Sequence, residues 1–151
     1  MNKRAHNNQG FTIIELVLVI LLVLVLAVIV AASYNSVRTR ERNTERRNEI
    51  TIIQGKLEVY YAKFSQYPTL EEINNDKWRG ENLKDFDTNQ LADPLNPDTK
   101  TLADKPTKHQ YSYEVSSTDG KDCDNTDTPC TQYTLTTNYD GGGTFSKTNI
   151  N

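Results

Sequence analysis

The hydrophobic residues of this chain are concentrated in one run near its N-terminus. Residues 11–32 contain 20 apolar residues out of 22, and neither proline nor glycine interrupts them. As an α-helix this run would be about 33 Å long, enough to cross the roughly 30 Å hydrocarbon core of a bilayer. The pattern therefore predicts a transmembrane helix over residues 11–32.

Behind this run, apolar residues recur once per helical turn. They are Ile50, Ile53, Leu57, Tyr60 or Tyr61, and Phe64. Because this spacing places them along one face of a helix, it predicts that the helix continues over residues 33–66 and buries that face. We expect the helix to end before Tyr67-Pro68, since the residue before a proline disfavours the helical conformation. The complete helix would have about 55 residues and a length of roughly 80 Å.

Charged residues dominate the segment between the apolar run and this stripe. Residues 33–47 hold five arginines and two glutamates, a net charge of +3. Opposite charges three residues apart give a helix small support. Such pairs are Arg38/Glu41, Arg42/Glu45 and Arg46/Glu49. We interpret the charged segment as a solvated helix face, and salt bridges to another chain are the alternative.

Residues 67–151 are predicted to form a small head. Thr69 and Glu72 have the spacing of a capping box, which opens a short helix. Residues 74–108 are expected to be a loop, with turn-forming sequence at residues 93–98. Alternating patterns predict antiparallel strands at residues 111–115 and at 133–137 extended to Tyr139, with a third near 144–146. We interpret the strand tyrosines as core residues rather than as an aromatic binding cage.

Composition limits what this head can be. Residues 33–151 contain 32 hydrophobic residues, roughly 27%, which excludes a second large core and the usual kind of soluble enzyme. From Asn48 onward, ten basic residues face seventeen acidic ones, a net charge of −7. An acidic head argues against a dedicated nucleic-acid binder, which needs a basic surface.

The ten residues before the apolar run form a short polar leader. Lys3 and Arg4 precede the membrane span, so the leader should stay in the cytoplasm and the head should be exported. A secretory signal would place a small-residue cleavage site after its apolar core. Here the suitable junction, Gly10–Phe11, lies before that core. Cleavage there would remove residues 1–10 and leave the apolar helix on the mature chain.

One acidic residue interrupts the apolar run. A carboxylate such as that of Glu15 costs several kcal/mol near the bilayer interior unless it is paired. It either reaches the interface from the end of the helix or pairs with a cation of another chain. A free amino group on Phe11, created by cleavage, is the best candidate for that cation.

The segment Gly10-Phe11-Thr12-Ile13-Ile14-Glu15-Leu16 resembles the processing site of type IV pilins and pseudopilins. The resemblance covers roughly the first 40 residues. It implies that a prepilin peptidase cleaves after Gly10 and methylates Phe11, and that Glu15 pairs with the N-terminal amine of a neighbouring subunit during assembly. It also implies an α+β fold, the pilin-like lollipop, in which a long N-terminal helix packs on a small antiparallel sheet. Many pilins carry a proline near the end of the apolar run, where this chain has Ala32.

The resemblance implies a structural subunit of a type IV pilus filament, not an enzyme. A pseudopilin of a type II secretion or DNA-uptake machine is the alternative, and a solitary membrane-anchored binding protein is a distant one. The implied partners are copies of the chain itself, prepilin peptidase, the pilus assembly machinery and minor pilins; surface adhesion and DNA contact stay open. The subunit would cross the membrane once before assembly and become extracellular afterwards.

Side chains that could carry other chemistry are few. Cys123 and Cys130 lie close in the exported part, where an oxidising compartment favours a disulfide between them. The histidines, His6 and His109, suggest no catalytic relay, and we expect a surface position for His109. No nucleophile or phosphate-binding motif occurs in the sequence.

Four aspartates crowd the loop around Cys123. They are Asp119, Asp122, Asp124 and Asp127. Converging carboxylates suit calcium, but the spacing does not match an EF-hand loop. We therefore predict no cofactor and keep these four residues as candidates for a calcium site.

Overall fold

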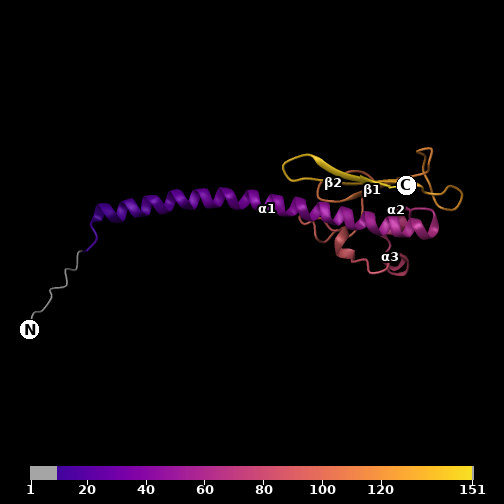
Figure 1. The fold of residues 1–151 in the computed structure, drawn as a ribbon, viewed down its shortest axis with the longest axis horizontal. Helices are drawn as coiled ribbons and strands as arrows, with labels where there is room; N and C mark the ends of the chain where they lie inside the picture. Colours follow the sequence, from indigo (N-terminus) through magenta and orange to yellow (C-terminus); the bar gives the residue numbers. More distant parts are fainter. Residues whose placement is uncertain (1–9, 151) are drawn as a thin grey trace, which may run out of the picture. The chain divides into compact units, whose positions relative to one another are not determined.

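The computed structural model describes residues 10–150 (Figure 1). Lys3, Arg4 and His6 lie outside the described residues, as does the rest of the predicted leader before Gly10. The elements are α1 (Ile13–Phe64), α2 (Leu70–Asn74), α3 (Asp76–Asn82), the 3-10 helix η1 (Thr88–Leu91), β1 (Ser112–Ser116), β2 (Gln132–Asn138) and β3 (Thr144–Thr148). The chain divides into two compact units, one that ends at Arg38 and one that begins at Thr39. The fold is α+β, as the sequence predicts.

The first unit consists mainly of the N-terminal part of α1. The predicted helix is present without interruption through the apolar run. Within the described residues, α1 is the one helix long and apolar enough to cross a membrane. Length and composition alone are weak support for a membrane span. The residues at the start of the helix must therefore supply further evidence of its role.

In the second unit, the later part of α1 carries the predicted buried stripe. Ile50, Ile53 and Leu57 are completely buried and Tyr60 nearly so, whereas Phe64 is 40% exposed, so its assignment to the core was wrong. The helix ends at Phe64 because Ser65 adopts a left-handed conformation with φ 58°, a common way to terminate a helix. This end lies shortly before Tyr67-Pro68, as expected.

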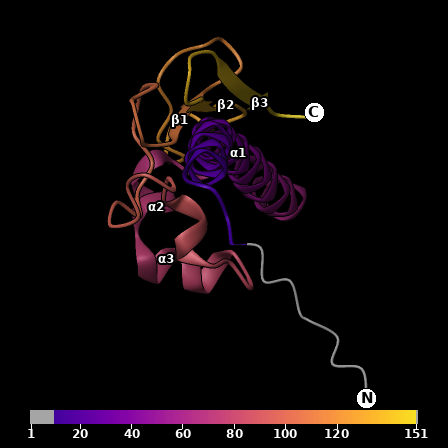
Figure 2. The ribbon, with the colours of Figure 1, turned by 90° about the vertical axis from the view of Figure 1, so that its left-hand side faces the viewer.

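The three strands form an antiparallel sheet in the order β1-β2-β3. The sheet lies on one side of the later part of α1, and α3 lies on the other side (Figures 1 and 2). Tyr113, Tyr133 and Leu135 point from the sheet into the core, each at most 2% exposed. Tyr133 packs edge-on against Tyr67, with ring centroids 4.6 Å apart. The interpretation of the strand tyrosines as core residues is confirmed for Tyr111, Tyr113 and Tyr133.

The segment between α1 and the sheet corrects the sequence analysis. The capping box is present: Thr69 Oγ1 accepts from the N–H of Glu72 and Glu72 Oε2 accepts from the N–H of Thr69. Residues 74–108, however, are not only loop, since they contain α3 and η1. Asn75 caps α3 by accepting a hydrogen bond from the N–H of Trp78. The asparagine cap was a readable signal, but a helix of seven residues lacks the length that makes an apolar period visible.

Candidate processing and assembly site

The predicted cleavage site lies on exposed chain outside any helix or strand. Gly10, Phe11 and Thr12 precede α1, and the Phe11 side chain is 83% exposed. A Cβ atom built on Gly10 meets no atom within 4 Å. The folded chain would therefore accept a larger residue at position 10, so any requirement for glycine must come from the enzyme that binds there.

Thr12 and Glu15 begin the helix. Thr12 Oγ1 accepts a hydrogen bond from the N–H of Glu15 over 3.3 Å, as an N-cap side chain does. Glu15 lies in the first turn, where a negative charge stabilises the helix by about 0.3–1 kcal/mol through its interaction with the helix dipole. The Thr-x-x-Glu spacing is a second reason for a glutamate here, which our sequence analysis missed. The Glu15 carboxylate forms no ion pair with other residues between 10 and 150.

The helix that follows exposes apolar side chains on all its sides. Every large hydrophobic residue from Ile13 to Val30 is exposed, including Leu24 at 59% and Val28 at 71%. Soluble monomers rarely expose an apolar patch beyond a few hundred Å². This surface therefore needs lipid or other chains to cover it, and no stripe on it marks a preferred internal partner.

In the head, the structure corrects the interpretation of the charged run as a solvated face at Arg42 and Arg46, whereas Arg40 and Arg47 are exposed as expected. Arg46 is completely buried and binds both carboxylate oxygens of Asp93, at 2.6 and 2.9 Å. A second carboxylate, that of Asp140, lies 3.0 Å from Arg46 Nη1. The predicted partner Glu49 is instead bound by the hydroxyl of Tyr111. The sequence alone could not reveal this, because Asp93 and Asp140 are 47 and 94 residues away from Arg46.

The same cluster fastens the β2–β3 hairpin to α1. Arg42 Nε donates to Asp140 Oδ2 over 2.6 Å, and Asn43 hydrogen-bonds with the backbone of Asp140 in both directions. Burial would raise the pKa of Asp140, but the hydrogen bond from Arg42 and the charge of Arg46 outweigh it and lower that pKa. The hairpin and the Asp93 turn are thus positioned by charges on one helix.

Glu49 lies next to this cluster and differs from it in charge state. Burial raises the pKa of its carboxyl to about 7, and the hydrogen bond from Tyr111 only partly offsets this. The charge of the neighbouring Glu45 acts in the same direction as burial. Glu49 is therefore a carboxyl group whose charge changes near neutral pH.

His109 is less exposed than the sequence analysis expects. It adopts a left-handed conformation with φ 56°, and its Nδ1 lies 3.8 Å from Asp93 Oδ1. Its side chain is 32% exposed. It lies beside Asp93 at the edge of the arginine cluster.

Cys123 and Cys130 form the predicted disulfide. Closing a loop of this size stabilises the fold by about 2–3 kcal/mol in the chain-entropy account. Cys130 is completely buried, and its carbonyl accepts a hydrogen bond from the N–H of Tyr67 over 2.7 Å. The disulfide therefore closes the loop between β1 and β2 on itself, and the hydrogen bond from Tyr67 ties that loop to the segment after α1.

The aspartates of this loop have structural partners of their own. Asp124 Oδ1 accepts the backbone N–H groups of Thr126, Asp127 and Thr128, each at 3.0 Å, which lowers the pKa of Asp124. Among the residues that the structure describes, no three acidic, histidine or cysteine side chains converge as a metal site would require. The calcium site stays a prediction without structural support.

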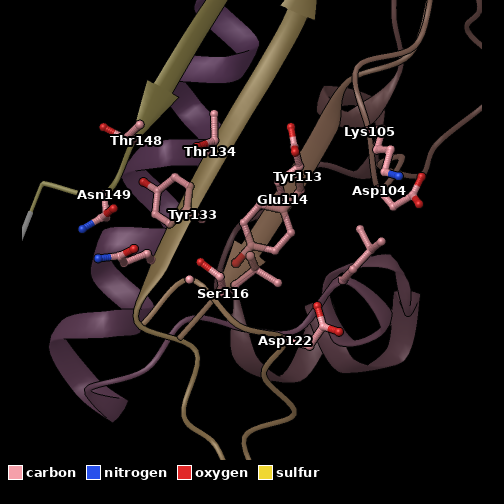
Figure 3. Close-up of a pocket in the computed structure, with 14 residues that line it drawn as sticks. Asp104, Lys105, Tyr113, Glu114, Ser116, Asp122, Tyr133, Thr134, Thr148 and Asn149 are labelled. Carbon is pink, nitrogen blue, oxygen red and sulfur yellow. The ribbon is translucent and has the colours of Figure 1, made fainter. Parts of the chain in front are cut away.

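A polar groove of about 790 Å³ opens on the outer face of the sheet (Figure 3). Its floor is the cross-strand row Glu114, Thr134 and Thr148. Asp122 from the disulfide loop and the neighbouring pair Asp104 and Lys105 line its sides. Nothing in the sequence analysis indicates this groove, because its residues come from segments far apart along the chain.

Comparison with known proteins finds a match for the N-terminal segment. Residues 5–31 match the family model described as the prokaryotic N-terminal methylation motif, the signature of type IV pilins and pseudopilins. No curated protein and no solved structure matches the chain. The motif covers the predicted cleavage junction, Glu15 and most of the exposed apolar helix. It implies processing by prepilin peptidase and a membrane-anchored precursor of the pilin or pseudopilin kind.

Proposed function

We propose that this chain is a structural subunit of a type IV pilus filament. The observation that carries the proposal is the methylation motif at residues 5–31, which includes most of an apolar helix that no other described residue covers. The subunit is inserted in the membrane as a precursor, cleaved after Gly10 and methylated at Phe11. It then polymerises through the apolar part of α1, and it catalyses no reaction itself.

Transfer of the helix from lipid into a filament replaces lipid contacts with contacts to neighbouring helices. A continuous apolar surface without a polar stripe suits this exchange, because neighbours can cover it from several sides. Cleavage creates a positively charged amine on Phe11. In a neighbouring subunit shifted along the filament axis, this amine meets the Glu15 carboxylate at low dielectric constant, where the attraction is stronger than in water. The ion pair thus fixes the register between subunits.

The alternative within the family is a pseudopilin of a secretion or DNA-uptake machine. Such a subunit would share the motif, the cleavage and the pairing of Glu15, and would differ in the length and location of its polymer. A solitary anchored binding protein is less well supported, because an anchor alone needs neither a processing motif nor a glutamate inside its apolar run.

Electron microscopy of surface filaments, with peptide mapping of their main component, tests the proposal. We expect long fibres in which this chain is the principal protein. Gly10→Val should prevent cleavage and fibre formation while the head keeps its disulfide and thermal stability, since position 10 has space for a side chain. Long fibres that lack the chain would support the pseudopilin alternative instead.

A further inference from the structure

The structure separates the four arginines between residues 40 and 47 into two groups. Arg42 and Arg46 are bound inside the head, as described above. Arg40 and Arg47 are exposed and lie two helical turns apart on one face of α1. Neither guanidinium forms an ion pair with another described residue, although Arg47 lies over the ring of Phe145, 5.2 Å from its centroid. Arg40 and Arg47 thus have no anionic partner among residues 10–150.

The groove on the outer face of the sheet has the opposite charge. Its charged residues are three carboxylates, those of Asp104, Glu114 and Asp122, and the ammonium of Lys105, which gives a net charge of −2. Glu114 and Asp122 are exposed and form no ion pair within residues 10–150. Hydroxyl groups of Thr134 and Thr148 beside Glu114 add hydrogen-bond acceptors for a guanidinium.

We propose that this groove is a docking surface for a second copy of the chain, whose Arg40 and Arg47 enter it and pair with Glu114 and Asp122. The inference deepens the proposed function, on which it rests, by naming a contact between neighbouring heads. Arginine suits the groove because its planar guanidinium can bind a carboxylate through two parallel hydrogen bonds. The occupant is another subunit because the two surfaces on this chain are complementary in charge.

The positions of the two surfaces decide what kind of assembly results. Phe145, which Arg47 covers, lies on the sheet face that packs against the core, because it pairs with the buried Thr137. Glu114 lies on the opposite face. One two-fold dimer contact cannot engage both faces of the sheet at once. The contact is therefore heterologous, and contacts of that kind repeat into a ring or an open helical filament.

The docking contact sets register more than it supplies affinity. Exposed ion pairs contribute little singly and are weakened by salt. Opposite charges across an interface instead favour one alignment and disfavour others, where like charges meet. The contact between heads thus adds a second constraint on alignment to the one that the pairing of Glu15 with the Phe11 amine supplies.

Charge reversal tests the pairing in the full chain. Arg40→Glu should lower the yield of sheared filaments about tenfold at low ionic strength, because it brings another carboxylate to an acidic groove. Glu114→Arg should lower it similarly, and the two changes together should restore most of it. Lys77→Glu reverses an exposed lysine on α3 and serves as the matched control, with yield unchanged. If the double variant stays as defective as Arg40→Glu although cleaved and folded, the pairing is wrong.

Cysteine crosslinking tests the contact independently of yield. Filaments of a chain that carries both Arg40→Cys and Glu114→Cys should give a ladder of covalent oligomers after mild oxidation. Lys77→Cys with Glu114→Cys should stay monomeric. Filaments without a ladder, or with dimers alone, would overturn the inference and leave the proposed function in place. Absence of filaments from the unaltered chain would overturn the proposed function, and the inference with it.

Discussion

The two parts of α1 are continuous in sequence but differ in how far other residues of the chain bury their side chains. Up to Arg38, the large hydrophobic side chains are exposed on every side of the helix. From Thr39 onward, one face is buried, and even an arginine on that face finds both of its carboxylate partners within the chain. The C-terminal part of the helix is therefore packed within the head, whereas the apolar side chains of its N-terminal part are left exposed.

This difference shows where function and stability are separated in the molecule. Substitutions on the buried face of the later part of α1 should act on the folding of the head. Substitutions in the earlier part should leave the head unchanged and act on membrane insertion, processing or assembly. The following predictions test this division, from the largest expected effect to the smallest.

The largest effect is expected at Glu15. Glu15→Ala should abolish filaments while insertion, cleavage after Gly10 and the thermal stability of the head stay normal, because the lost carboxylate has no ionic partner among residues 10–150. Glu15→Gln should be nearly as damaging, since it keeps the shape and loses the charge. The measurement compares precursor, cleaved subunit and sheared filament for each variant.

A second function of Glu15 needs its own control. If the carboxylate only stabilised the first turn of the helix, its loss would cost at most about 1 kcal/mol and filaments would persist. Thr12→Ala removes the hydrogen bond to the N–H of Glu15 and keeps the carboxylate. This variant should still form filaments. Normal yield from Glu15→Ala would contradict the pairing between subunits.

Arg46 and Arg38 provide a matched pair across the division. Arg46→Ala should destabilise the head by about 3–5 kcal/mol, because it leaves buried Asp93 without its counter-charge. Arg38→Ala, in the exposed part of the same helix, should change stability by less than about 0.5 kcal/mol. Thermal unfolding of the full chain in detergent, followed by near-ultraviolet circular dichroism of the tyrosines, measures both. Equal effects would mean that the cluster around Arg46 adds nothing.

Two leucines of α1 test the same division without charge. Leu57 is completely buried, so Leu57→Ala should cost about 2–5 kcal/mol of head stability. Leu24 is 59% exposed, and Leu24→Ala should leave the unfolding temperature of the head unchanged. The same unfolding measurement applies. A shift of the head transition by Leu24→Ala would show that the two parts are coupled in stability.

The smallest effect concerns pH. The pKa of Glu49 is about 7 in the fold, above the ordinary value of 4.5, mainly through burial. The protonated form is therefore the one that the fold favours, and its contribution to stability is complete below pH 4.5 and is lost as the pH rises through 7. After allowance for partial solvent screening, we expect a loss on the order of 1 kcal/mol. In Glu49→Gln, the fall in unfolding temperature between pH 5 and 8 should be shallower, and an unchanged slope would contradict this assignment.

The features that could be predicted from the sequence are those that depend on neighbouring residues. The long apolar helix, the N-terminal methylation motif and the strands around Tyr113, Tyr133 and Phe145 rest on local patterns and are visible in the sequence. The disulfide was predictable as well, since the two cysteines of the sequence are seven residues apart in one loop. Properties that depend on neighbouring residues can be read without knowledge of the fold.

What escaped prediction depends on contacts between distant segments. Arg46 looked like one more solvated arginine, because the residues that neutralise it lie in a turn and a hairpin much further along the chain. Likewise, the bound Arg42 cannot be distinguished from the exposed Arg40 until it is known which face of the helix packs against the sheet. The groove at Glu114 exists only after β1, β2 and the disulfide loop come together. A pattern of charges indicates that ion pairs can form, but which residues pair depends on the fold.

The central claim is that the exposed part of α1 is a processed assembly surface. Mass spectrometry of the N-terminal peptide, from chains recovered in sheared surface filaments, tests it most directly. We predict a chain that begins at Phe11 and carries one methyl group on its amine. An intact Met1 in the filament, or a new terminus behind the apolar run, would contradict the account, because the helix would then be unprocessed or absent.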